Sequence, residues 1–166
     1  MSKLHLGIDP GKSGAMVGFK DHSNNGWGLV VHNLTTWRSL EEINDELSMA
    51  RQYGKTEEVV ALIENVHAFP TDGRSSAFKF GQNLGQWEGM LTAHNIPFTK
   101  VVPQKWMSFY GKMPKDKRER KNKLKEIAQK ILDDNGLPYN ATLKNSDAIL
   151  IANFSVQGGL DGKTNE

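Results

Sequence analysis

The sequence predicts an α/β protein with a mixed five-stranded sheet flanked by helices. Short alternating apolar segments fill the first 34 residues, which is typical of a meander of strands. An aliphatic run follows at 59–63, and segments with helical spacing stand before and after it. A meander that leads into crossover connections gives one sheet with both antiparallel and parallel neighbours.

The three strands of the meander are separated by turn residues. Residues 4–9 alternate between apolar and polar or small side chains up to Asp9, and Pro10-Gly11 breaks the strand there. The second strand is expected over 14–19, after a turn short enough for an antiparallel hairpin. The third strand is expected over 27–34, after a polar turn.

A helix and a central strand follow the meander. Ser39 and Glu42 form a capping box at the start of the helix, and Gly54 ends it. Residues 59–63 are all aliphatic, as expected for a strand that is buried on both faces. This strand ends at Glu64.

The second half of the chain is mostly helical. Its expected elements are a helix from Ser75 or Ser76 to about His94, a strand over 96–102, a short helix over 103–110, a basic helix over 114–132 and a last helix over 146–157. Because a chain of 166 residues is most simply one domain, residues 1–157 are expected to form a single domain, and they contain no internal repeat. Residues 158–166 lack apolar content and are expected to be a flexible tail.

The composition excludes several kinds of site. The chain has no cysteine, so disulfides, thiolate zinc sites and cysteine nucleophiles are excluded. No apolar run approaches the roughly 18 residues of a membrane span, and no secretory signal opens the chain, so a cytoplasmic protein without a membrane partner is expected.

Three acidic residues stand at the ends of expected elements. A carboxylate at the end of a buried strand, as at Asp9, costs free energy unless a cation or hydrogen bonds compensate. If the strands that end at Asp9 and Glu64 are parallel neighbours, about 4.8 Å apart, both side chains can reach one divalent ion. Asp147 lies on the apolar stripe of the last helix.

Each acid also has a plainer interpretation. Asp9 can form a turn with Gly11, Glu64 can lie on the surface at a strand end, and Asp147 suits the N-terminal end of a helix dipole. Together the three favour a site for a hard cation such as Mg²⁺ or Mn²⁺. Carboxylates that hold two such ions about 4 Å apart suit phosphodiester hydrolysis.

Four segments with matching spacing resemble segments of one protein family. They are Leu6-Gly7-Ile8-Asp9-Pro10-Gly11, Leu62-Ile63-Glu64-Asn65-Val66, Ser76-Ala77-Phe78-Lys79-Phe80-Gly81-Gln82 with Gly85 and Gly89, and Ser146-Asp147-Ala148-Ile149-Leu150-Ile151-Ala152. This ordered set resembles the RuvC-like Holliday junction resolvases, most of all the compact forms found in phages. The resemblance runs from about residue 3 to residue 156.

The resemblance implies a ribonuclease H-like fold and a metal-dependent, structure-selective endonuclease. Its substrates would be Holliday junctions and other branched DNA in a bacterial or phage-infected cell. Asp9, Glu64 and Asp147 match the catalytic acids that bind Mg²⁺ or Mn²⁺. The family usually has a fourth metal-binding position about one turn before the last aspartate, where this chain has Lys144. Lys144 is either a plain loop lysine or a cation placed beside the scissile phosphate.

Basic residues are concentrated in 112–130, where nine lysines and arginines stand against three acids, a net +6 in a chain of net +2. Such a run is either a solvated helix face or a surface that binds DNA phosphates. Its candidate contacts are Lys117, Arg118 and Lys125, and the resemblance places Lys105 and Lys121 at basic positions near the active site.

The loop after Glu64 carries further candidates for DNA binding. In the family, an aromatic residue of this loop stacks on bases opened at the junction centre, and His67 or Phe69 is expected in that role. Arg74 ends the loop and is a third candidate. The plainer interpretation is an aromatic residue buried under the loop.

Gly81, Gly85 and Gly89 recur every four residues on one helix. Interior glycines cost roughly 1 kcal/mol each in helix propensity, so the spacing indicates a close approach to the backbone. Tight packing on the chain's own sheet explains it, whereas the resemblance implies the interface of a homodimer with Phe78 and Trp87. Two active sites related by a two-fold axis would fit a four-way junction.

Three alternatives to a junction resolvase remain open. One is another ribonuclease H-like nuclease, which acts on flaps, forks or RNA–DNA hybrids. Another is a junction-binding protein without catalysis, if Lys144 prevents metal loading. The third is an actin-like nucleotide-binding fold, because Asp9-Pro10-Gly11 followed by Ser13 and Gly14 loosely resembles its phosphate loop, although the chain is short for that duplicated fold.

Overall fold

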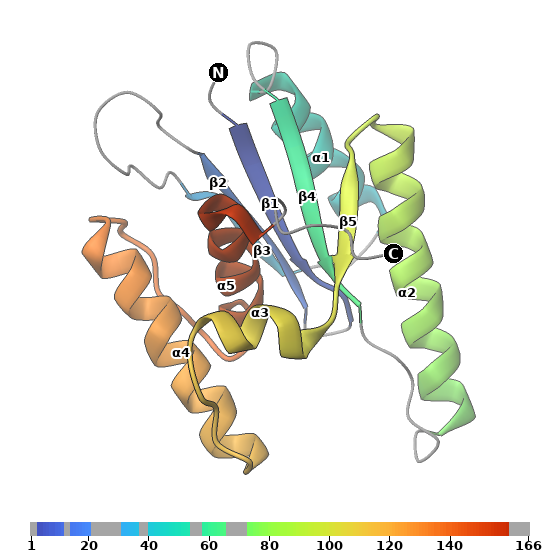
Figure 1. The fold of residues 1–166 in the computed structure, drawn as a ribbon. Coiled ribbons are helices and arrows are strands. Elements are labelled where there is room, and N and C mark those ends of the chain that lie inside the picture. Colours follow the sequence, from blue (N-terminus) through green and yellow to red (C-terminus); the bar gives the residue numbers. More distant parts are fainter. Residues whose placement is uncertain are drawn as a thin grey trace.

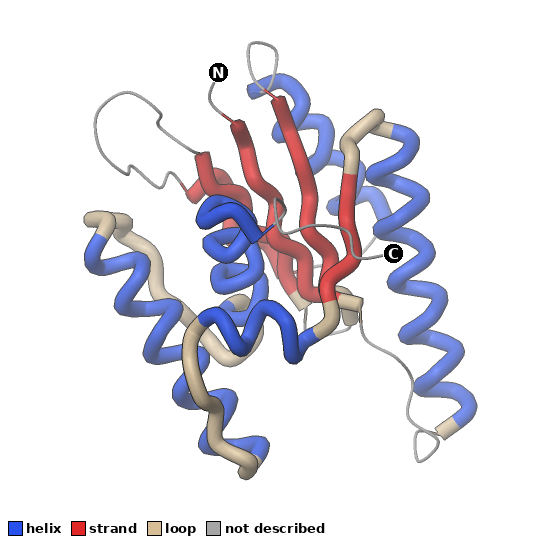
Figure 2. The backbone as a smooth tube through the Cα atoms, viewed as in Figure 1, coloured by secondary structure: helices blue, strands red, loops and turns tan. Residues whose placement is uncertain are grey.

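A mixed sheet with helices on both faces forms the centre of the molecule (Figure 1 and Figure 2). The structure is a computed structural model that describes residues 3–11, 14–20, 31–36, 40–53, 58–65 and 73–159. Its strands are β1 (Lys3–Asp9), β2 (Ala15–Lys20), β3 (Val31–Thr36), β4 (Glu58–Glu64) and β5 (Phe98–Val101), in the spatial order β3-β2-β1-β4-β5. The expected α/β architecture with a mixed sheet is confirmed.

The pairing of β1 with its two neighbours positions the first two acids. β1 is antiparallel to β2, as expected for a hairpin, and parallel to β4. Ile8 is paired with Ile63, so Asp9 and Glu64 follow one residue later on adjacent strands. Both carboxylates therefore leave the sheet at the same edge.

The helices divide between the two faces of the sheet (Figure 1). They are α1 (Leu40–Tyr53), α2 (Arg74–Ala93), α3 (Pro103–Phe109), α4 (Lys117–Asp134), α5 (Ser146–Phe154) and the π-helical turn η2 (Ser155–Gly159). One apolar cluster joins α1 and α2 to β1 and β4, and a second joins α3, α4 and α5 to the opposite face. Helix α5 lies directly on the sheet, and α4 packs outside it (Figure 2).

Several helix boundaries differ from the sequence prediction for local reasons. Helix α2 begins after Gly73, before the two serines expected to cap it. Helix α4 begins at Lys117 because the Asp116 carboxylate caps it, accepting a hydrogen bond of 2.9 Å from the Glu119 amide. Helix α3, in contrast, begins at Pro103 as the sequence predicts, because an N–H in the first turn would have no partner within the helix.

Helix α5 is buried on all sides, with all nine of its residues in the interior. The stripe that predicted a buried Asp147 is therefore part of a fully enclosed helix and not one face of an amphipathic one. A Cβ atom on Gly7 would overlap the Ala152 amide nitrogen and the Ala148 carbonyl oxygen. The missing side chain of Gly7 thus lets α5 lie directly against β1.

Some expected features fall outside the described residues. They are the polar turn at 21–26, the start of the third strand at 27–30, the helix cap at Ser39, the helix end at Gly54, and residues 160–166 of the expected tail. Within the described ranges, none of the helices combines the length and apolar character needed to span a bilayer.

Candidate active site

Three carboxylates converge at one rim of the sheet. Asp9 ends β1, Glu64 ends β4 and Asp147 stands in the first turn of α5. Glu64 and Asp147 are buried, with 7% and 6% of their surface exposed. Asp9 interacts electrostatically with both of the other acids. The sequence prediction that these distant acids lie together is therefore consistent with the structure.

Burial and mutual repulsion raise the pKa values of Asp9 and Glu64, the two acids at strand ends. Desolvation, then the nearby charges of Glu64 and Asp147, raise the pKa of Asp9 well above its ordinary value. Desolvation and the charge of Asp147 likewise raise the pKa of Glu64. A hydrogen bond between the two carboxyl groups makes a smaller contribution, which raises the pKa of Asp9 and lowers that of Glu64.

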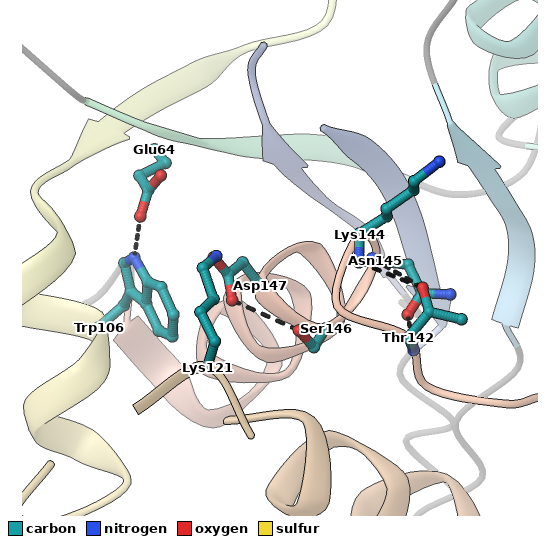
Figure 3. A network of polar contacts seen from close by, with 8 residues as sticks. All are labelled: Glu64, Trp106, Lys121, Thr142, Lys144, Asn145, Ser146 and Asp147. Carbon is teal, nitrogen blue, oxygen red and sulfur yellow. Dashed lines mark hydrogen bonds and ion pairs between the residues drawn. The ribbon is translucent and has the colours of Figure 1, made fainter. Parts of the chain in front are cut away.

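Trp106 fixes the position of the Glu64 carboxylate. Its indole Nε1–H donates a hydrogen bond of 3.0 Å to Glu64 Oε1, as Figure 3 shows. The tryptophan is 1% exposed and belongs to the apolar cluster under α3 and α5. Sequence reasoning missed this residue, although a buried tryptophan usually needs a partner for its N–H.

Lys121 balances the negative charge of the site. Its Nζ atom reaches from α4 to Asp147 Oδ2, with which it forms an ion pair (Figure 3). Burial by itself would lower the pKa of Lys121, but attraction to Asp147, Asp9 and Glu64 outweighs it and raises the pKa. The predicted basic residue near the active site thus contacts one of the acids directly.

Helix α2 supports the turn that follows Asp9. The side-chain oxygen of Asn83 accepts a hydrogen bond of 2.7 Å from the Gly11 amide. Asn83 is 4% exposed, and its Nδ2 atom has no hydrogen-bond partner among the described residues. The sequence carried a signal for this residue, because Asn83, Trp87 and Leu91 share one helical face.

The three carboxylates have the right chemistry for a hard divalent cation, but their side chains are not yet spaced as ligands of one ion. Three carboxylates offer the oxygen ligands that Mg²⁺ and Mn²⁺ prefer. Over the described ranges, however, no three His, Cys, Asp or Glu side chains are already spaced as ligands of one ion. Lys144 adds no ligand, because a protonated lysine has no lone pair to offer a cation. Its exposed side chain also points away from the Lys121–Asp147 pair (Figure 3).

The other candidate DNA contacts lie mainly on the surface around α3 and α4. The exposed ones are Lys105, Lys117, Arg118, Lys144 and Arg74, and Lys125 is half-buried. Other basic residues of the same run have structural partners, and two of them bind backbone carbonyls. Arg120 donates hydrogen bonds to the carbonyls of Pro114 and Lys115, and Lys123 donates one to that of Lys112. His67 and Phe69 lie outside the described residues.

The glycine stripe of α2 faces away from the chain's own sheet. A Cβ atom on Gly81, Gly85 or Gly89 would meet nothing within 4 Å, which excludes packing on the described sheet as the reason for these glycines. Phe78 is 73% exposed on the same helix. Trp87, however, is 2% exposed within the core beneath α2, so its prediction as an interface residue is wrong.

The comparisons with known proteins bear on the fold. No family model matches the chain, and no curated protein matches it. Thermus thermophilus RuvC matches with a TM-score of 0.67, 16% identity and 97% of each chain covered. A second RuvC structure, in complex with a Holliday junction substrate, matches with a TM-score of 0.66 at 14% identity over 98% of this chain and 97% of that one.

Two further resolvases have the same fold. The fowlpox virus resolvase, solved with Holliday junction DNA, matches with a TM-score of 0.53 at 15% identity, over 93% of this chain and 99% of that one. The yeast mitochondrial Holliday junction resolvase Ydc2 matches with a TM-score of 0.50 at 18% identity, over 97% and 81%. The chain therefore has the fold of the RuvC-type Holliday junction resolvases, which is a ribonuclease H-like fold.

Proposed function

We propose that this protein is a Mg²⁺- or Mn²⁺-dependent endonuclease that cuts branched DNA, with four-way junctions as its main substrate. The observation that carries the proposal is the convergence of Asp9, Glu64 and Asp147 at one rim of a RuvC-type fold. Two of the similar structures contain Holliday junction DNA, which supports the choice of substrate.

The three carboxylates would hold the metal ions. The bound ions would supply activation of a water molecule and neutralise charge that develops on the scissile phosphate. The chain's own residues would prepare this chemistry. Trp106 holds Glu64 in place, and the Asn83 hydrogen bond to Gly11 steadies the turn that follows Asp9.

The basic surface around the site would hold the DNA backbone. Lys105 on α3 and two residues in the first turn of α4, Lys117 and Arg118, are exposed. None of the three forms an ion pair with an acid among the described residues, so they suit phosphate contacts. Lys125, Lys144 and Arg74 are further proposed contacts. His67 and Phe69 remain proposed to stack on bases opened at the junction centre.

A homodimer would place two active sites on one junction. The exposed glycines of α2 and the exposed Phe78 support an interface between two copies of this helix. A two-fold symmetric pair of nucleases matches the two symmetry-related strands of a four-way junction.

A second candidate function is junction binding without catalysis. Lys144 stands where the family usually has a metal-binding residue, and the described residues contain no preformed metal group. Metal-dependent cleavage decides between this candidate and the nuclease. A preference for flaps, forks or RNA–DNA hybrids over four-way junctions would instead favour another ribonuclease H-like nuclease.

The decisive experiment is cleavage of a panel of end-labelled DNAs by the purified full chain. The panel contains a four-way junction, a three-way junction, a flap, a fork, an RNA–DNA hybrid and linear duplex, each with Mg²⁺, with Mn²⁺ and with EDTA. We expect paired, symmetric cuts in the four-way junction only when metal is present. Asp9→Asn should abolish cleavage, whereas Asp45→Asn, the same chemical change at an exposed position on α1, should not.

Cleavage that persists in EDTA, or in Asp9→Asn at the wild-type rate, would refute the assigned site. Tight junction binding with no cleavage in either metal would establish the binding protein instead.

A further inference from the structure

One cation of the chain itself lies among the three carboxylates. Lys121 Nζ forms an ion pair with Asp147 Oδ2, and the same ammonium group interacts electrostatically with Asp9 and Glu64. The lysine comes from α4, while the acids come from β1, β4 and α5. The Lys121 side chain therefore extends from the outer helix into the rim of the sheet.

We propose that Lys121 is an internal counter-ion that a divalent ion must displace, so that Lys121 sets the metal affinity of the site by competition. The proposal rests on the proposed function only in requiring that the carboxylates bind metal. In the metal-free protein the ammonium stabilises the buried carboxylates. On loading, it is released from Asp147 and becomes available to a DNA phosphate.

The charges of the cluster favour competition between the Lys121 ammonium and a divalent ion for Asp147. Asp147 is 6% exposed, so an ammonium and a divalent ion on the same carboxylate would repel each other with little screening by water. The carboxylate already has one strong partner in the ion pair with Lys121. An ion that takes Asp147 as a ligand would therefore compete with the Lys121 ammonium for the charge of this carboxylate.

The lysine also has the freedom that displacement requires. The Lys121 side chain is 37% exposed, in contrast to the 8% exposure of the Asp147 side chain. A long, flexible stem and an open path to solvent allow the ammonium to leave while α4 stays in place. The surrounding basic surface makes a nearby DNA phosphate its natural second partner.

The first test measures Mn²⁺ binding by calorimetry in the full chain. Lys121→Met keeps most of the apolar stem and removes the charge, and it should bind Mn²⁺ about fivefold or more tightly, as expected for two linked equilibria. Lys130→Met removes a charge from the exposed face of the same helix, where the lysine pairs with Asp134, and should bind Mn²⁺ as wild type does. Equal affinity in wild type and Lys121→Met would overturn the proposal.

The second test uses the wild-type protein and so does not depend on how the variant folds. Trace acetylation with isotope-labelled acetic anhydride, read by mass spectrometry, reports the accessibility of each lysine amine. Acetylation of Lys121 should rise severalfold when saturating Mg²⁺ is added, relative to Lys130 in the same sample. Unchanged or reduced acetylation of Lys121 would overturn the displacement.

The outcomes separate this inference from the proposed function. No Mn²⁺ binding by wild type or by Lys121→Met would refute the metal site and with it the nuclease. Metal binding and junction cleavage with no change at Lys121 would refute only the counter-ion role.

Discussion

Gly7 of β1 and Ala152 of α5 approach each other so closely that a side chain on Gly7 would overlap the Ala152 backbone. This contact seats α5 directly on the strand that ends at Asp9. Because Asp147 stands in the first turn of α5, the same contact determines how far the third carboxylate lies from the first two. One glycine two residues before Asp9 therefore has a direct effect on the candidate site.

Gly7→Ala should destabilise the protein and impair metal binding together. The added methyl group forces α5 away from β1, and overpacking of this kind costs about 2–3 kcal/mol. The expected loss in Tm is roughly 5–10 °C for a chain of this size. Thermal unfolding in EDTA measures the first effect, and Mn²⁺ calorimetry below the transition measures the second. An unchanged Tm would contradict the close packing of α5.

Sequence patterns alone located the carboxylates because they are tied to element ends. Alternation and aliphatic runs mark where β1 and β4 end, and a parallel register then forces Asp9 and Glu64 to be neighbours. The side-chain contacts that organise the site could not be predicted in this way. Trp106 and Lys121 reach acids that are 42 and 26 residues away in the chain, so only the packing of α3 and α4 brings them there.

The incorrect placement of Trp87 has a geometric cause. The glycines of α2 and the residues Asn83, Trp87 and Leu91 both recur every four residues, but the two sets are offset by two positions. Residues two apart on a helix do not share a face. Trp87 therefore points into the core beneath α2, while Gly85 and Gly89 are exposed on the same helix.

Asp9→Asn should stabilise the metal-free protein at neutral pH. Because burial and the neighbouring acids raise the pKa of Asp9 in the folded state, the unfolded chain ionises first as the pH rises. Stability from this group is therefore full below the ordinary pKa near 4 and is lost as the pH rises through the folded-state pKa. The variant keeps a neutral side chain and avoids this loss.

Thermal unfolding in EDTA across pH 4 to 8 checks the sign of the effect. The Tm of Asp9→Asn should exceed that of wild type by a few degrees at neutral pH, and the difference should shrink toward pH 4. Saturating Mg²⁺ should raise the Tm of wild type more than that of the variant, since metal binding stabilises the folded state. A difference that is constant across the pH range would argue against a charge effect at Asp9.

Trp106→Phe should weaken metal binding by roughly 10-fold, the lower end for a residue that orients a metal ligand. The substitution keeps an aromatic ring but removes the N–H group that holds Glu64 Oε1. Trp87→Phe is a matched control, because Trp87 is equally buried and its Nε1 has no partner among the described residues. Calorimetry with Mn²⁺ should separate the two variants, and equal affinities would argue against a positioning role for Trp106.

Lys117→Ala should weaken junction binding and reduce its dependence on salt. If Lys117 contacts one phosphate, the slope of log K against log salt should fall by about 0.9. Lys130→Ala removes the same charge from the far end of α4, where the side chain pairs with Asp134, and should leave the slope unchanged. Fluorescence anisotropy with a labelled four-way junction in EDTA, at several salt concentrations, measures both slopes. Equal slopes for wild type and Lys117→Ala would exclude the contact.

Gly85→Ala should affect the single chain and the proposed dimer in opposite directions. A Cβ atom at this position meets nothing within 4 Å, and alanine favours a helix over glycine by about 0.5–1 kcal/mol. The isolated chain should therefore become slightly more stable. In a dimer the added methyl group would hold two copies of α2 apart and weaken their association.

Sedimentation equilibrium and thermal unfolding of the same samples separate these effects. We expect wild type to associate, Gly85→Ala to shift toward monomer, and the monomer to unfold at a slightly higher temperature than the wild-type monomer. Lys79→Ala changes an exposed residue on a different side of α2 and should leave association unchanged. A monomeric wild type would refute the dimer. Undiminished association of Gly85→Ala would place the interface away from the glycine stripe, since a Cβ atom on Gly85 meets nothing within 4 Å in the single chain.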